Sequence, residues 1–190
     1  AIQQTAFRVH PYHHEVIGDM ADLQTITRDM LHAHYRKYYV PNNATLVLSG
    51  DFDRTKARAL VEKYFGPIPR AAEVPRQAAR PAAHPGETRI EMEAGVELAR
   101  VYLNWPSPPH LKAEDAELDL VARILSNGKT SRLYKRLVYD LQIAQNVVAN
   151  QASMEIANNF DIVVTAKSGH GADELLKAID EELAKLRAGG

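Results

Sequence analysis

Four side chains near the start of the chain, His10, His13, His14 and Glu15, are of types that could bind a metal ion. Imidazole nitrogens and carboxylate oxygens are common zinc ligands, and two histidines four residues apart share one face of a helix. His10 and His14 have this spacing, but Pro11 interrupts it and the segment lacks a helical pattern. We therefore interpret these residues as loop histidines, with adventitious metal binding as the alternative.

Two other pairs could also do chemistry. His32 and His34 are two residues apart, so a helix directs their side chains to different sides. They therefore cannot bind the same metal ion. Asp51 and Asp53 flank Phe52 in a turn, where a paired-carboxylate acid–base site is conceivable. Turn and helix-capping roles explain both carboxylates, and we favour those roles.

Composition and motifs exclude several classes of site. The chain of 190 residues has 23 Lys and Arg against 24 Asp and Glu, which argues against a dominant nucleic-acid or anionic-membrane surface. It contains no cysteine, so disulfides, thiolate catalysis and cysteine metal sites are excluded. No glycine-rich phosphate loop and no Gly-x-Ser-x-Gly motif is present.

The elements that must position these residues follow from periodicity and capping. Thr27, with Asp29 in the first turn, predicts the start of a helix that ends near Tyr39 before Pro41. The apolar run Ala44–Ser49 predicts a buried strand. Further elements are predicted at Arg54–Tyr64 (helix capped by Asp53), Thr88–Glu93 and Leu98–Trp105 (strands joined by a hairpin or bulge at Ala94-Gly95), Ala113–Leu125 and Thr130–Asp140 (helices), Ile143–Met154 and Ile156–Thr165 (an antiparallel strand pair), and Glu174–Leu186 (helix capped by Asp173).

A linker divides these elements into two regions. Residues 70–86 contain three prolines, many alanines and few large apolar side chains, as in a semi-stiff linker. The region after the linker predicts an α+β fold, an antiparallel sheet with helices packed on one face. The region before it has one predicted strand and two helices. We expect that strand to complete a sheet whose other strands lie elsewhere.

Several segments, taken in order, resemble the M16 family of zinc peptidases, which includes insulinase, pitrilysin and the mitochondrial processing peptidases. The segments are FRVHPYHHEVIG (7–18), TRDMLHAHYRKYYVPNNATLVLSGDFD (27–53), VEKYFGPIPR (61–70) and NGKTSRLYKRL (127–137). The resemblance implies the LuxS/MPP-like α+β fold of that family. It also implies that residues 1–69 are the end of a first, catalytic-type domain, 70–86 a linker, and 87–190 most of a second, inactive domain.

The resemblance also implies a zinc site that this chain does not carry. Family members hold zinc on a helix with an inverted His-x-x-Glu-His motif, together with a third Glu ligand, and the metal activates a water molecule for peptide hydrolysis. No His-x-x-Glu-His occurs here, so the ligands are expected upstream of Ala1. We therefore expect no catalytic residue and no metal ligand in this chain.

The family's second domain often supplies an Arg and, seven residues later, a Tyr that bind the substrate backbone. Alignment on the Ser-Arg-Leu segment places Val138 and Gln145 at these positions, and neither can replace its counterpart. A one-residue slip would bring Arg136 near the Arg position. For Arg132, Tyr134 and Arg136 we favour the role of an ordinary amphipathic helix face.

The resemblance thus implies part of a zinc-dependent endopeptidase subunit that cleaves peptides or small proteins in a chamber of paired domains. This chain would form chamber wall and subunit contacts, with a second M16-like subunit as partner. The substitutions at Val138 and Gln145 suit the zinc-bearing partner of a heterodimer or an inactive relative. The alternatives are a non-catalytic structural or substrate-presenting subunit and an unrelated α+β binding module. The sequence does not fix the location; a soluble protein of the bacterial cytoplasm or periplasm is compatible with it.

Overall fold

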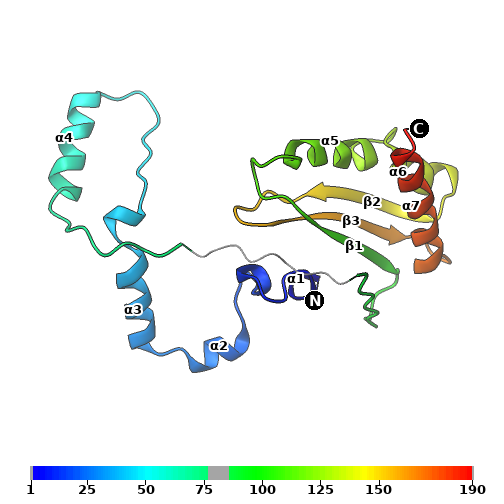
Figure 1. Cartoon of the computed structure of the whole chain (residues 1–190), viewed down its shortest axis with the longest axis horizontal. Coiled ribbons are helices and arrows are strands. Elements are labelled where there is room, and N and C mark those ends of the chain that lie inside the picture. Colours follow the sequence, from blue (N-terminus) through cyan, green and yellow to red (C-terminus); the bar gives the residue numbers. More distant parts are fainter. Residues whose placement is uncertain (1, 77–85, 190) are drawn as a thin grey trace. The chain divides into compact units, whose positions relative to one another are not determined.

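The computed structural model describes residues 2–76 and 86–189 (Figure 1). The chain divides into two compact units, one made of Ala1–His13 with Ala79–Gly190 and the other of His14–Ala78. We call the first the sheet unit and the second the helical unit. Among the described residues, no helix combines the length and the apolar character that crossing a bilayer requires.

The sheet unit is built around three antiparallel strands in the order β1-β3-β2. The strands are β1 (Arg100–Ser107), β2 (Ala144–Gln151) and β3 (Asn158–Ala166). The other elements of the unit are α1 (Ile2–Ala6), η1 (Pro11–His13), α5 (Asp115–Ser126), α6 (Arg132–Tyr134), the π-helix η3 (Lys135–Asp140) and α7 (Ala172–Arg187). Two-residue alternation along β3 separates its side chains into two sets, one on each face of the sheet.

One face of the sheet carries the hydrophobic core. Alternate residues of β3 are buried there and pack against apolar side chains of α5, α6, η3 and α7. The fully buried large side chains are Leu125, Leu133, Leu137, Ile162, Leu175, Ile179, Val147, Val164 and Asn158. Removing this apolar surface from water is the main force that holds the unit together. The predicted α+β fold, with helices packed on one face of an antiparallel sheet, is confirmed.

The helical unit consists of α2 (Met20–Thr25), α3 (Arg28–Tyr38), η2 (Pro41–Asn43) and α4 (Arg54–Phe65). Two predicted caps are confirmed. The side chain of Thr27 accepts a hydrogen bond from the Met30 N–H, and Asp53 accepts from the N–H groups of Thr55 and Lys56. These bonds satisfy backbone donors that the first turn of a helix leaves free.

The helical unit differs from the prediction at Ala44–Ser49, which is not a strand and is not buried. Leu46, Val47 and Leu48 are 54%, 78% and 52% exposed. A strand needs a hydrogen-bonding neighbour, and the described residues of this unit offer none. Across residues 14–76, all of which are described, no residue falls in the buried class.

Two predictions for the sheet unit are also wrong. Thr88–Glu93 pairs with no strand among the described residues, and its Arg89 forms ion pairs with Glu91 and Asp173. Asp173 does not cap α7, whose N-cap is Gly171 without a side-chain hydrogen bond. Instead, the carboxylate of Asp173 accepts a hydrogen bond from Arg89 at 2.9 Å. Parts of the predicted linker, residues 77–85, lie outside the described residues.

Candidate substrate-binding region of the sheet unit

The predicted position Val138 lies in the π-helix η3, which continues α6. Thr130–Asp140 was expected to be an ordinary helix, and its second half instead has the wider π geometry. Single π turns are rare and recur at functional sites. The side chain of Val138 is half-buried and packs against the core.

The predicted position Gln145 lies at a second backbone irregularity. The register of β2 against β3 shifts between Ala144 and Asn146, so Gln145 is the extra residue of a β-bulge. A bulge locally bends a strand and redirects the side chain of the extra residue. Gln145 is exposed, whereas Val138 packs against the core, so the two positions lie in different environments.

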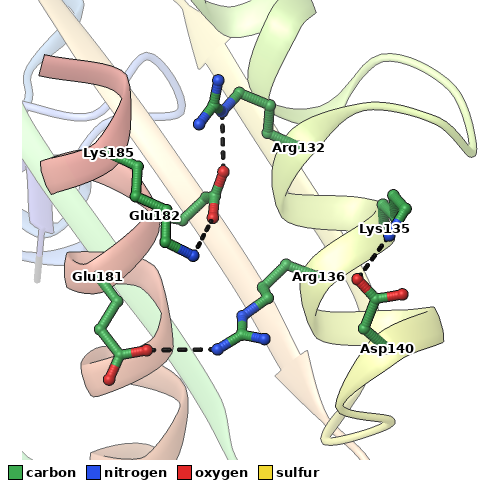
Figure 2. Close-up of polar contacts among 7 residues, drawn as sticks. All are labelled: Arg132, Lys135, Arg136, Asp140, Glu181, Glu182 and Lys185. Carbon is green, nitrogen blue, oxygen red and sulfur yellow. Dashed lines mark hydrogen bonds and ion pairs between the residues drawn. The ribbon is translucent and has the colours of Figure 1, made fainter. Parts of the chain in front are cut away.

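Ion pairs to α7 fix the helix that carries Val138 (Figure 2). Arg132 donates from Nε to Glu182 at 2.8 Å, and Lys185 binds the other oxygen of Glu182 at 3.3 Å. One helical turn on, Arg136 reaches Glu181 at 3.4 Å. Glu182 is only 7% exposed, so its carboxylate is held between two cations away from water. Arg136, near the family's Arg position in sequence, is therefore engaged with α7.

Asp161 lies near the middle of the sheet on the face opposite the core. It is half-buried in the central strand β3, and the Nδ2 of Asn104 on β1 donates to its Oδ1. Burial raises the pKa of the Asp161 carboxyl, and the hydrogen bond from Asn104 opposes this in part. Among the described residues, no Lys, Arg or His forms an ion pair with Asp161.

The carboxylate of Asp115, which is buried at the start of α5, has an environment opposite to that of Asp161. It accepts hydrogen bonds from Gln151 Nε2 at 3.0 Å and Leu111 N at 2.8 Å, and His110 Nδ1 lies 3.3 Å away. These donors lower the pKa of Asp115, with the bond from Gln151 the largest cause. They also hold Leu111 in a left-handed conformation, with φ of 59°. Asp115 therefore stabilises the loop between β1 and α5.

The histidines near the start of the chain do not form a metal site in the described structure. His10 is 4% exposed, its Nδ1 accepts from the Tyr12 N–H, and its ring contacts those of Phe7 and Tyr12. Burial lowers its pKa. Within residues 2–76 and 86–189, no group of three or more His, Cys, Asp or Glu side chains is placed to hold a metal ion. The described side chains therefore do not fit a zinc ion.

The other two predicted pairs lie at exposed positions of the helical unit. On α3, His32 and His34 are both exposed, and the ring of His34 lies 4.6 Å from that of Tyr38. In the turn before α4, Asp53 caps the helix and Asp51 is exposed. Among the described residues, neither pair belongs to a group of three or more side chains that could hold a metal ion.

Residues 25–190 match the family model described as the peptidase M16 inactive domain. The chain belongs to this family. The resemblance recognised in the sequence is thereby confirmed. The M16 inactive domain name describes the matched part of the chain, which includes all of β1, β2, β3 and the helices that cover them.

Relatives of this M16 chain include a bacterial zinc protease. The chain is 28% identical over 188 residues to the zinc protease PqqE of Helicobacter pylori, covering 97% of this chain and 42% of that protein. A crystal structure of a protease from Helicobacter pylori matches with a TM-score of 0.85 and 27% identity, over 100% of this chain and 48% of that one. The chain thus spans less than half the length of these relatives.

A third comparison supports the fold alone. A peptidase M16 inactive domain from Pseudomonas fluorescens matches with a TM-score of 0.78 at 20% identity, over 97% of this chain and 44% of that one. Sequence reasoning missed the half-buried carboxylate of Asp161 and the buried carboxylate of Glu182. A charged residue within the apolar run Phe160–Thr165 was the available signal for Asp161.

Proposed function

We propose that this chain is a non-catalytic part of a zinc-dependent endopeptidase of the M16 family. The observation that carries this proposal is the match of residues 25–190 to the inactive domain. A zinc protease that is 28% identical over 97% of this chain supports it. In this proposal the parent protein hydrolyses peptides or small proteins. The zinc ligands belong to parts of the parent beyond these 190 residues.

The proposal assigns different roles to the two units. Residues 87–190 form the inactive domain, whose covered sheet supplies a wall of the reaction chamber. Residues 1–69 are assigned to the end of the catalytic-type domain, although the family model already matches from residue 25, and residues 70–86 link the two domains. The exposed apolar segment 44–48 supports this division, because it needs a neighbouring strand that the described helical unit lacks.

The positions Val138 and Gln145 would line the chamber at the places where many family members bind the substrate backbone. Their location at a π turn and at a β-bulge supports this assignment, since both irregularities recur at binding sites. Neither side chain reproduces the donors of an Arg or the phenol of a Tyr. The parent is then either the zinc-bearing member of a pair with a second M16-like subunit, or an inactive relative.

The second candidate is a structural or substrate-presenting subunit, favoured by the substitutions at Val138 and Gln145. The two candidates differ in whether the assembled parent cleaves peptides. The first predicts zinc-dependent cleavage by the parent, and the second predicts peptide binding without cleavage.

The proposal is tested first on the 190-residue chain and then on the parent. Zinc content is measured together with cleavage of a quenched-fluorescent peptide, with and without a chelator. We expect the chain alone to bind no stoichiometric zinc and to cleave nothing, whereas the parent binds zinc and loses activity with chelator. Tightly bound zinc and chelator-sensitive cleavage by the chain alone would contradict the proposal and assign a site to His10, His13, His14 and Glu15.

A further inference from the structure

A short segment before the helical unit belongs to the sheet unit. Residues 1–13 cluster with residues 79–190, so the helical unit is inserted in the sequence between two pieces of the sheet unit. We call the described part of this segment, residues 2–13, the strap. The helical unit is therefore joined to the sheet unit at both of its ends, and one of these connections runs through the strap.

Buried side chains and a hydrogen bond hold the strap on the sheet unit. Phe7 and His10 are 2% and 4% exposed, although Phe7 does not belong to the main core cluster. Helix α1 of the strap contacts β1. The hydroxyl of Tyr12 accepts a hydrogen bond at 3.2 Å from the N–H of Ile156, in the loop between β2 and β3. Phe7 is therefore the apolar anchor of the strap, and Tyr12 is its polar anchor.

The turn between these anchors depends on a neutral imidazole. The backbone N–H of Tyr12 donates to His10 Nδ1 at 3.1 Å, and the centroid of the His10 ring lies 5.1 Å from that of Phe7 and 4.9 Å from that of Tyr12. A ring nitrogen that accepts a hydrogen bond carries no proton, so this bond exists only while His10 is neutral. An imidazolium has a donor at both nitrogens and would direct a proton at the Tyr12 N–H. Protonation of His10 thus breaks the turn that places the Tyr12 ring.

The surroundings of His10 do not stabilise a positive charge. Its Nε2 is buried and has no hydrogen-bond partner among the described residues. Burial lowers the pKa of His10, because the charged form loses its hydration. The charged and titratable side chains on the strap, β1, β3 and the β2–β3 loop include Arg8, Tyr12, His13, Arg100, Tyr102, Glu155 and Asp161. None of them is a cause of the lowered pKa, which comes from burial alone.

We propose that the strap docks on the sheet unit while His10 is neutral and is released when His10 is protonated. Because docking favours the neutral imidazole, its stability is fully present above the unfolded pKa of about 6.5 and decreases as the pH falls below that value. Release leaves the helical unit joined to the sheet unit at one end only. The docking itself is independent of the proposed function. Its consequence for the parent, a looser hold of the catalytic-type domain on the inactive domain in acid, rests on that function.

Nuclear magnetic resonance on the 190-residue chain tests the inference between about pH 7.5 and about pH 5, where histidines titrate and ordinary carboxylates stay ionised. Hydrogen exchange of the Ile156 amide, corrected for the intrinsic rate at each pH, reports docking because this amide donates to Tyr12. The amides of Ile162 and Val164 report whether the core stays folded. We expect Ile156 to lose its protection on acidification while Ile162 and Val164 keep theirs.

A variant of the apolar anchor links docking to the titration of His10. Phe7→Ala removes the most deeply buried side chain of the strap and should leave Ile156 unprotected at both ends of the pH range. The pKa of His10, read from its ring signals, should be lower in the unmodified chain than in Phe7→Ala. The loss of Ile156 protection with pH should agree with this difference, because the same free energy links the two equilibria.

Three asparagine variants identify the group that titrates. His10→Asn keeps a side-chain acceptor for the N–H two residues further on, as in an Asx turn, and it has no charge to gain. Docking in this variant should be independent of pH. His32→Asn changes an exposed histidine of α3, and Asp161→Asn removes a carboxyl whose pKa is raised by burial. Both should keep the pH dependence of the unmodified chain.

Three results would overturn the inference. They are unchanged protection of Ile156 across the pH range, a pH dependence that survives in His10→Asn, and equal pKa values of His10 in the unmodified chain and in Phe7→Ala. If His10→Asn releases the strap at every pH, the two pKa values decide. Failure of the proposed function is a separate result, because it appears as absent zinc-dependent cleavage by the parent. Such a parent would leave the pH-dependent docking of the strap standing.

Discussion

The sheet unit and the helical unit have similar local sequence signals but different energetics. Both contain amphipathic helices, and both contain a short apolar run. In the sheet unit the run Ile162–Val164 lies between two partner strands and under helices. In the helical unit the run Leu46–Leu48 has no partner strand among the described residues and is exposed. The two units therefore have similar local propensities to form helices and strands, but only the sheet unit buries its apolar side chains in a core.

The largest expected difference between the units comes from one matched leucine substitution in each. Leu125 of α5 is fully buried, and Leu60 of α4 is 53% exposed. Leu125→Ala should lower the free energy of unfolding by about 2–5 kcal/mol because it leaves a cavity in the core. Leu60→Ala should change it by less than about 0.5 kcal/mol. Urea denaturation of the two variants measures both values, and equal losses would show that the helical unit has a core of its own.

A smaller difference is expected within the sheet unit, between two neighbouring glutamates of α7. Glu182→Ala removes the nearly buried carboxylate that binds Arg132 and Lys185, and should cost about 1–3 kcal/mol. Glu181→Ala removes the more exposed partner of Arg136 and should cost less than about 1 kcal/mol. Denaturation at low and high salt measures both. A cost for Glu181→Ala that equals that of Glu182→Ala would show that burial of the pair does not set its strength.

The pH dependence should differ in sign between Asp115 and Asp161. The folded state lowers the pKa of Asp115, so its carboxylate stabilises the fold above the unfolded pKa of about 3.9, and this stability is lost as the pH falls through the folded value. The folded state raises the pKa of Asp161, so ionisation of this group opposes folding as the pH rises above about 3.9.

The two asparagine variants test these signs. Asp115→Asn should reduce the urea midpoint at neutral pH, and the difference from the unmodified chain should shrink in acid. Asp161→Asn should equal or exceed the unmodified chain at neutral pH, and lose that advantage in acid. Urea midpoints between about pH 3 and about pH 7 give the comparison. A large loss of stability in Asp161→Asn at neutral pH would contradict the assignment of an uncompensated charge.

The smallest effect on global stability is expected from the caps of the helical unit. Asp53→Ala removes two hydrogen bonds to the first turn of α4, a local loss of about 0.5–2 kcal/mol. Asp51→Ala, two residues earlier, removes no cap and serves as the control. The Asp53 variant should lower helicity by circular dichroism and leave the main unfolding transition unchanged. A shift of that transition would mean that α4 unfolds together with the sheet unit.

Sequence reasoning succeeded where the signal was local. The caps at Thr27 and Asp53, the helix α5 and the antiparallel pairing of β2 with β3 all follow from short patterns, and the structure confirms them. It failed at Ala44–Ser49 because strand formation depends on a partner far away in the chain, which a local pattern cannot supply.

The candidate site shows the same limit. The hydrogen bond between Asn104 and Asp161 joins residues 57 positions apart, and only the register of β1 against β3 brings them together. The π turn at Val138 and the bulge at Gln145 likewise depend on packing that sequence periodicity does not record. The sequence around Glu182 predicts an ordinary residue on the surface of a helix. Its partner Arg132 lies far away in sequence, so no local pattern indicates their ion pair.

Hydrogen exchange on the 190-residue chain tests the contrast between the two units most directly. The free energy of opening is read amide by amide, so each unit reports separately. The amides of Val147, Ile162 and Val164 should exchange only through global unfolding, whereas those of residues 44–48 should exchange as in an unfolded peptide and those of α4 nearly as fast. Protection at residues 44–48 that matches β3 would contradict the account, because it would show a partner strand within this chain.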